Sequence, residues 1–180
     1  MNTSSKTRVA VNGYGVIGKR VADAVAQQED MELAGVSDIS ADWRARMVTQ
    51  KGFRLYGAAS EQAQAMRDAG LDVAGVLDDL LGASDVVVDC TPKRVAAKNV
   101  ELYRQKGMKF IVQGGEKHEV TGHSFVAEAS YESALGRDST RVVSCNTTSI
   151  VRTLTALKHA GLLRRARGTL LRRATDPWES

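Results

Sequence analysis

The chain has 180 residues, of which 43% are hydrophobic and 26% charged, and its formal net charge is +4. This length and composition suit one globular domain, or one domain with the start of another, and no repeat or low-complexity segment is visible. Two cysteines and no signal-like N-terminus argue against a secreted disulfide framework. No apolar run approaches ~18 residues, so we expect no membrane span and a reducing cytoplasm as the location.

A glycine-rich loop follows the first predicted strand. Residues 8–11, with the sequence RVAV, predict a buried strand, and this strand leads directly into NGYGVIG. Apolar residues then recur at helical spacing, so a G-x-G-x-x-G motif lies between a strand and a helix, which predicts dinucleotide binding. Gly13 would permit the tight turn, Gly15 the approach of a pyrophosphate, and Gly18 close packing of helix on strand.

An acidic residue ends the second predicted strand, over residues 32–37. Asp38 lies 20 residues after Gly18. In a βαβ unit of this kind, an acidic side chain at that spacing accepts hydrogen bonds from the adenosine ribose hydroxyls. Alternatively, Asp38 caps the next helix, predicted over residues 42–50, or holds the turn before it.

The remaining segments alternate between strand and helix patterns. Strands are predicted over residues 52–57, 73–75, 85–90, 110–112, 141–144 and 167–173, and helices over residues 60–69, 78–81, 96–106 and 145–160. The sequence therefore predicts an α/β fold with a Rossmann-type, doubly wound, mostly parallel sheet. Loops at strand carboxyl ends line the ligand crevice of such sheets, so Thr91 and Pro92 are candidates to flank a cofactor.

One cysteine lies where a strand pattern changes to a helix pattern. Cys145 follows Val-Val-Ser and precedes Asn-Thr-Thr. Unpaired backbone N–H groups at a helix start favour the thiolate, which is the nucleophilic form. The alternative is a buried cysteine that acts as a small apolar residue, and this stretch alone leaves both open. Cys90, at the end of an apolar strand, is expected in the core.

The histidines and a cluster of basic residues near the C-terminus indicate which kinds of ligand the chain could bind. His118, His123 and His159 lack partners at metal-ligand spacing, so no metal site is expected. Residues 152–173 contain seven Lys or Arg and no Asp or Glu, which suits an anionic ligand or nucleic acid.

The chain resembles the archaeal-type phosphorylating glyceraldehyde-3-phosphate dehydrogenases. The resemblance extends over residues 8–176 and is carried by VNGYGVIGKRVADA, DCTP, QGGEKH and, above all, RVVSCNTT at residues 141–148. Family members are about twice this long. The resemblance therefore implies a dinucleotide-binding domain over residues 1–143, followed over residues 144–180 by the nucleophile helix and first strand of an incomplete catalytic domain.

The resemblance also implies roles for individual residues. Cys145 matches the nucleophile that forms a thioester during oxidation of glyceraldehyde 3-phosphate to 1,3-bisphosphoglycerate. Substrate contacts would come from Ser144, Asn146, Thr147 and Arg172. Further cofactor contacts would come from Val16, Ile17, Gly115 and Arg173. None of the three histidines matches the catalytic base, which we expect in the absent half.

Partners follow from the same resemblance: glyceraldehyde 3-phosphate, inorganic phosphate and, for full-length members, a homotetramer, with neither nucleic acid nor membrane. The cofactor would be NAD or NADP. The family usually has a basic residue at the position of Asp38, and this carboxylate favours NAD because it would repel a 2′-phosphate. Two alternatives remain, a non-catalytic dinucleotide-binding or thiol redox-sensing module, and an aspartate-semialdehyde-type reductase.

Overall fold

The computed structural model describes residues 6–92, 94–113 and 115–171. Its strands are β1 (Thr7–Asn12), β2 (Met31–Asp38), β3 (Leu55–Gly57), β4 (Gly75–Val76), β5 (Val86–Asp89), β6 (Lys109–Val112), β7 (Ser124–Phe125) and β8 (Ser139–Val142). Its helices are α1 (Val16–Ala26), α2 (Trp43–Gln50), α3 (Ser60–Asp68), α4 (Leu77–Gly82), α5 (Val95–Gln105), the 3-10 helix η1 (His118–Val120), α6 (Ala127–Ala134) and α7 (Cys145–His159).

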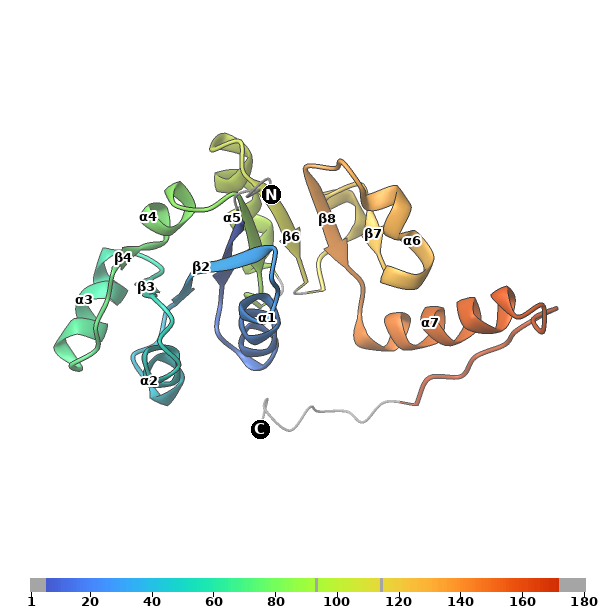
Figure 1. Cartoon of the computed structure of the whole chain (residues 1–180), viewed down its shortest axis with the longest axis horizontal. Coiled ribbons are helices and arrows are strands. Elements are labelled where there is room, and N and C mark those ends of the chain that lie inside the picture. Colours follow the sequence, from blue (N-terminus) through green and yellow to red (C-terminus); the bar gives the residue numbers. More distant parts are fainter. Residues whose placement is uncertain (1–5, 93, 114, 172–180) are drawn as a thin grey trace.

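The strands form one eight-stranded sheet in the order β4-β3-β2-β1-β5-β6-β8-β7 (Figure 1). Each neighbouring pair in it is parallel. The chain builds outward from β1 through β2, β3 and β4, and then returns to the other side of β1 with β5. This topology confirms the predicted Rossmann-type α/β sheet.

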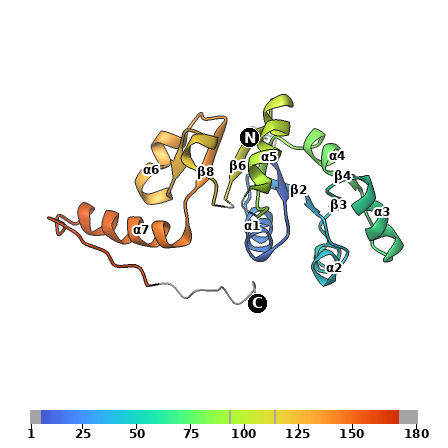
Figure 2. The same cartoon turned by 180° about the vertical axis from the view of Figure 1, so that it is seen from behind.

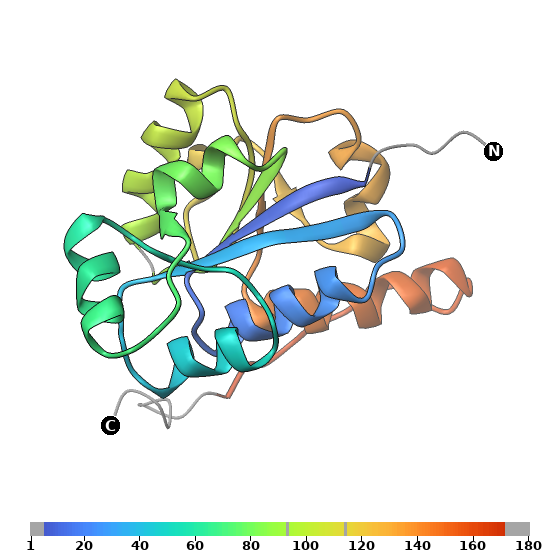
Figure 3. The same ribbon diagram turned by 60° about the vertical axis from the view of Figure 1, so that its left-hand side comes forward.

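Helices cover both faces of the sheet. On one face, α4 and α5 bury Leu80 and Val100 against strands that include β1 and β5. On the other face, α1, α2 and α3 bury Val48 and Met66 against β1, β2 and β3. Figure 3 shows the two layers, with the green helices α4 and α5 above the strands and the blue and teal helices α1 and α2 below them. Each such aliphatic side chain contributes about 1.5–3 kcal/mol when fully buried, so this double layer holds the sheet.

Three short elements between residues 118 and 134 were not predicted. They are η1, the two-residue strand β7 and the helix α6. Ser130 interrupts α6 with a non-helical φ of −141° and ψ of 20°, and its hydroxyl accepts a hydrogen bond from the Val126 N–H. Because α6 is interrupted in its middle, its apolar residues do not recur at a sustained helical spacing. The sequence therefore carries no signal for this helix.

The segment after β8 agrees with prediction at its start and differs later. The helix α7 begins at Cys145, as predicted, and Gly161 follows it with a φ of +72°. The strand predicted over residues 167–173 is wrong for its described part, because residues 167–171 form no strand. A strand needs a neighbour for its backbone hydrogen bonds, and Leu171 is 94% exposed. The division of the chain at residue 143 stays a prediction.

Candidate functional site

The candidate site residues follow the carboxyl ends of parallel strands and therefore share one edge of the sheet. Across that edge, β2 ends at Asp38, β1 leads into the glycine loop (residues 13–18), and the loops after β5 and β6 contain Thr91 and Gly115. Last in this order, β8 leads to Cys145 at the start of α7. Figures 1 and 2 show α1 and the start of α7 at this same end of the sheet. From β1 the chain adds strands first on one side and then, beginning with β5, on the other side. Open α/β sheets bind ligands at the point between β1 and β5 where this order of strands reverses. With ~4.8 Å between strands, the four steps from β2 to β8 span about 19 Å.

The glycine loop has the geometry of an anion site. Gly13 has a φ of +93° and donates its N–H to the Ser37 carbonyl at 2.7 Å. Gly15 is the N-cap of α1, and among the described residues no side-chain cap hydrogen bond is made to the first turn of that helix. A Cβ on Gly15 would meet no heavy atom within 4 Å, so the space in front of it is open. The free N–H groups and the open space fit the diphosphate of a dinucleotide, with Val16 and Ile17 each 43% exposed beside it.

Asp38 joins the glycine loop to the end of β2. Its side chain is buried, and Oδ2 accepts a hydrogen bond from the Tyr14 N–H at 2.6 Å. Oδ1 accepts from the N–H groups of Ile39, at 2.7 Å, and Ser40, at 3.0 Å. Asp38 therefore holds the turn after β2. The alternative role as a helix cap is wrong, because Asp42 caps α2 by accepting from the Arg44 N–H.

A buried carboxylate organises the loop after β5. Asp89 is fully buried, and its Oδ1 accepts hydrogen bonds from the Thr91 N–H at 2.9 Å and the Thr91 hydroxyl at 2.5 Å. Its Oδ2 accepts from Tyr103 Oη at 2.7 Å and from Asn99 Nδ2 at 2.8 Å. Tyr103 Oη in turn accepts from Asn12 Nδ2. Burial, and then the charge of Asp89, raise the pKa of the Tyr103 hydroxyl, which keeps it protonated and donating.

We expect Tyr103→Phe to lower the free energy of unfolding by about 1–3 kcal/mol, because a buried carboxylate and a buried amide each lose a partner. Urea denaturation measures this change. Tyr131→Phe is the matched control, since the Tyr131 side chain lies on an exposed position of α6. Equal losses in the two variants would mean that the Asp89 network contributes nothing to stability.

These network residues were missed by sequence reasoning. Asn12, Asn99 and Tyr103 lie 91, 10 and 14 positions from the residues that they contact. Only the unusual position of Asp89, a carboxylate in an otherwise apolar strand, signals a buried polar network in the sequence.

The two cysteines differ in exposure. Cys90 is partly buried and packs against the core, so its predicted place within the core holds only in part. Cys145 is exposed and is the first residue of α7. Ser144 caps this helix, because its Oγ accepts a hydrogen bond from the Thr147 N–H at 3.2 Å. Cys90 lies at the end of β5, where burial, and then the charge of Asp89, raise the pKa of its thiol to about 12. Cys145 is therefore the accessible thiol, and Asn146 beside it is half-buried.

The histidines do not supply a free base in this crevice. His123 is buried, and its ring nitrogens contact the hydroxyls of Thr140, at 2.7 Å, and Ser133, at 2.9 Å. Burial lowers its pKa, so the neutral ring serves as a structural link. His118 contacts Ser124 through Nδ1, and His159 ends α7.

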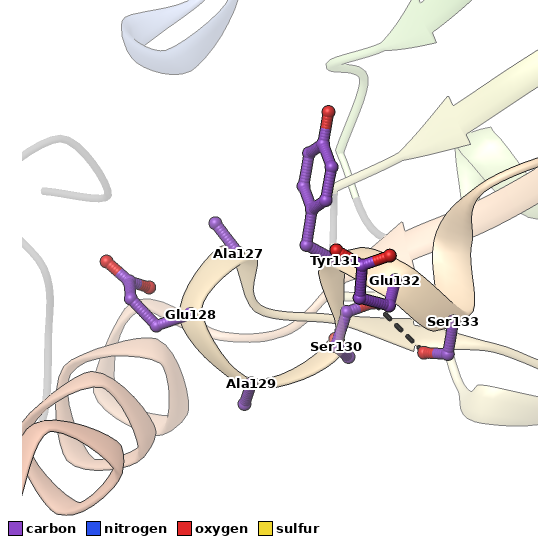
Figure 4. A pocket seen from close by; sticks show the side chains of 7 residues that line it. All are labelled: Ala127, Glu128, Ala129, Ser130, Tyr131, Glu132 and Ser133. Carbon is purple, nitrogen blue, oxygen red and sulfur yellow. Dashed lines mark hydrogen bonds between the residues drawn. The ribbon is translucent and has the colours of Figure 1, made fainter. Parts of the chain in front are cut away.

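A hollow of about 400 Å³ lies on α6 and is lined by residues 127–133 (Figure 4). None of these residues belongs to the predicted site. The Ser133 hydroxyl donates to the Ser130 carbonyl at 3.0 Å, so it is engaged within the helix. Glu128 is paired with Arg152 Nε at 2.6 Å, and Glu132 is the other carboxylate of this lining.

The remaining predicted features are a glycine after β6, two arginines near the C-terminus, and the expected absence of a metal site and a membrane span. Gly115 is exposed, with a φ of +87°, in the loop after β6. Arg172 and Arg173 lie outside the described residues. Within the described ranges, no three metal-ligating side chains lie together. In the same part of the chain, no helix has the length and apolar character needed to cross a bilayer.

The parallel sheet, the glycine loop and the open helix start together define a dinucleotide-binding domain of the Rossmann type. Residues 7–120 match a family described as dihydrodipicolinate reductase, N-terminus, and the chain belongs to this family. The match ends before β8 and Cys145, so it covers the nucleotide-binding elements and not the thiol. A solved NAD-binding protein from Listeria innocua has the same fold, with a TM-score of 0.53 and 17% identity over 87% of this chain and 41% of that protein.

Sequence relatives extend the comparison through the thiol. The glyceraldehyde-3-phosphate dehydrogenase of Methanothermus fervidus is 50% identical over 169 residues, which are 94% of this chain and 50% of the relative. That of Thermococcus kodakarensis is 50% identical over 175 residues, 97% of this chain and 52% of the relative. The chain spans about half the length of the curated relatives it matches. These matches confirm the resemblance to glyceraldehyde-3-phosphate dehydrogenases and support an NAD(P)-dependent oxidoreductase.

Proposed function

We propose that this chain carries the cofactor loops and the nucleophile of a phosphorylating glyceraldehyde-3-phosphate dehydrogenase. One observation supports this most strongly. The parallel strands order Asp38, the glycine loop, Thr91 and an exposed cysteine at a helix start along one edge of the sheet. A dinucleotide laid along that edge would have its adenosine end at β2 and its nicotinamide end toward β8 and Cys145.

In the proposed reaction, the Cys145 thiolate attacks the aldehyde carbon of glyceraldehyde 3-phosphate, forming a C–S bond and a thiohemiacetal. The Cys145 N–H at the start of α7 is suited to donate to the developing oxyanion. A histidine base from the half of the relatives that this chain does not span would accept the hydroxyl proton. Loss of hydride from the thiohemiacetal carbon to bound NAD(P)⁺ would leave a thioester at Cys145. Inorganic phosphate then attacks the thioester, releasing 1,3-bisphosphoglycerate and restoring the thiolate.

The glycine-loop motif and the resemblance to this family support the following binding roles. Substrate contacts are assigned to Ser144, Asn146, Thr147 and Arg172. Cofactor contacts are assigned to Gly13, Gly15, Val16, Ile17, Gly18, Asp38, Thr91, Pro92, Gly115 and Arg173. We also place the protein in the cytoplasm, where a reducing environment keeps the Cys145 thiol free, and expect a homotetramer when the rest of the relatives' length is present.

We expect NAD to bind at least ~10-fold more tightly than NADP, because the Asp38 carboxylate would repel a 2′-phosphate. Two like unit charges ~4 Å apart repel each other by about 4 kcal/mol at an effective dielectric of ~20. Dissolved salt reduces this repulsion. Dissociation constants for both cofactors, measured by fluorescence titration, test this preference. Asp38→Asn should bring the two constants together, whereas Ser40→Ala, which removes one donor to Asp38 but keeps the charge, should not. Equal affinities in the native chain would contradict the assignment.

Acylation of the thiol tests the proposed chemistry directly. Incubated with 1,3-bisphosphoglycerate, the chain is expected to form a thioester at Cys145 with release of phosphate, since this half-reaction needs no hydride transfer. Intact-protein mass spectrometry detects the adduct. Cys90→Ser should retain it, and Cys145→Ser should lose it. An adduct formed only with β-aspartyl phosphate would instead support the aspartate-semialdehyde-type reductase.

For the 180-residue chain alone, we expect oxidation of glyceraldehyde 3-phosphate to be far slower than the ~1–10³ s⁻¹ of ordinary enzymes. A general base typically contributes ~10²–10⁴-fold, and His123 is already engaged on both ring nitrogens. NADH formation in the presence of phosphate measures this rate. Ordinary turnover would mean that a histidine of this chain acts as the base.

A further inference from the structure

A buried carboxylate joins the loop after β6 to the loop after β5. Glu116 is only 6% exposed, and its Oε1 accepts a hydrogen bond from the Arg94 N–H at 2.9 Å. Arg94 directly precedes α5, in the loop that also carries Thr91 and Pro92. These two loops are neighbours, because β5 and β6 pair along the sheet. The Glu116 side chain therefore fixes the spacing between two loops assigned to the cofactor.

The backbone at Arg94 needs such support. Its φ is +75°, and it is the sole residue other than glycine with a positive φ in the described ranges. A residue with a Cβ adopts this conformation at a cost. No side chain caps α5, and the turn before it is closed by a hydrogen bond from the Val95 N–H to the Pro92 carbonyl at 3.0 Å. The bond from the Arg94 N–H to Glu116 adds a side-chain contact that holds Arg94 in this conformation.

The main chain of Glu116 is linked in turn to the strand that leads to the thiol. Its carbonyl accepts a hydrogen bond from Arg141 Nη1 at 2.7 Å. Arg141 lies on β8, four residues before Cys145, and its Nε donates to the Ser124 hydroxyl at 2.9 Å. Glu116 thus contacts the loop after β5 through its side chain and β8 through its backbone.

We propose that Glu116 is a positioning residue that sets the loop after β5 relative to β8, so that the nicotinamide end of a bound dinucleotide meets Cys145. The inference rests on the proposed function for what occupies the crevice. The connection between Arg94, Glu116 and Arg141 is independent of any ligand, so it can be tested without one.

Hydrogen exchange of the Arg94 amide tests the connection in the ligand-free chain. Glu116→Ala should raise the exchange rate by ~10-fold or more, because the acceptor is lost. Glu116→Gln should restore slow exchange, since its amide oxygen still accepts. Glu119→Ala is the matched control, an exposed carboxylate of η1 in the same region. Native exchange at Arg94 in Glu116→Ala would overturn the proposal.

Coupling to residue 94 separates positioning from a general loss of stability. Arg94→Gly removes the Cβ, so the positive φ no longer needs support. Glu116→Ala should weaken NAD binding by ~10-fold in the native background and by clearly less in the Arg94→Gly background. Equal losses in both backgrounds would contradict a role through Arg94. If Glu116→Ala does not fold, NAD affinity is compared between Glu116→Gln and Glu116→Met instead. Only Glu116→Gln keeps a hydrogen-bond acceptor at this position.

The two proposals fail separately. A native chain that binds no NAD would contradict the proposed function, while exchange at Arg94 would still decide the role of Glu116. A native chain that binds NAD, with Arg94 exchange unchanged in Glu116→Ala, would overturn the positioning role and leave the proposed function standing.

Discussion

Gly18→Ala is expected to lower the free energy of unfolding by about 3 kcal/mol or more. The added Cβ would overlap the Gly13 carbonyl oxygen and lie 2.9 Å from the Gly13 carbonyl carbon. Overpacking costs about 1–3 kcal/mol where side chains can move, and more where they cannot. Here the obstacle is backbone, and the Gly13 N–H is held by the Ser37 carbonyl at 2.7 Å. Urea denaturation with dinucleotide absent measures the loss.

Gly15→Ala provides the matched comparison in the same loop. Its Cβ would meet no heavy atom within 4 Å and its φ is −72°, so the stability change should stay below about 1 kcal/mol. NAD affinity should nevertheless fall by at least ~10-fold, because the methyl group would fill the space assigned to the diphosphate. The pair thus separates folding from binding. A Gly15→Ala chain that binds NAD normally would show that the diphosphate does not lie there.

The second large effect concerns alkylation of the two thiols. At pH 7, a thiol with a pKa of about 12 is thiolate in only ~1 of 10⁵ molecules, and only the thiolate attacks iodoacetamide. Cys90 is also partly buried, whereas Cys145 is exposed. We expect Cys145 to react at least ~100-fold faster, as peptide mapping after brief labelling would show.

The pH dependence sharpens this prediction. Because the Cys90 pKa is raised, each unit of pH above 7 should increase its labelling about tenfold until pH approaches 12 or the chain unfolds. Labelling in urea is the control, since unfolding removes the burial and should make both cysteines reactive. Preferential labelling of Cys90 under native conditions would contradict its position in the core.

Local patterns were sufficient for much of the fold and for part of the site. The glycine loop, the strand ending at Asp38 and the helix starting at Cys145 each depend on contiguous residues with a strong signal, and each was predicted in place. The strand predicted over residues 167–173 was wrong for its described part, because residues 167–171 pair with no strand of the described sheet. Periodicity describes what a segment can bury, whereas a strand also needs a partner.

Contacts between distant residues were beyond the sequence. Asp38 was predicted at its position, but its bond to the Tyr14 N–H depends on how two loops meet. The same holds for Tyr103 and Asn12, which are joined across 91 positions. Such bonds form where the sheet brings strand ends together, and a single sequence carries no record of which ends become neighbours.

The parallel sheet has one more consequence, for tolerance to changes in chain length. Each candidate functional residue follows its own strand, so the separations between these residues are set by the pitch of strand pairing and not by the sequence between them. Between β2 and β5 the chain forms α2, β3, α3, β4 and α4. The strands β3 and β4 lie beyond β2 in the sheet, whereas α4 packs back against β1 and β2. An insertion or deletion in a surface turn beside β3, α3 or β4 would leave Asp38, the glycine loop and Cys145 at unchanged distances, because the added chain only widens the flank of the sheet.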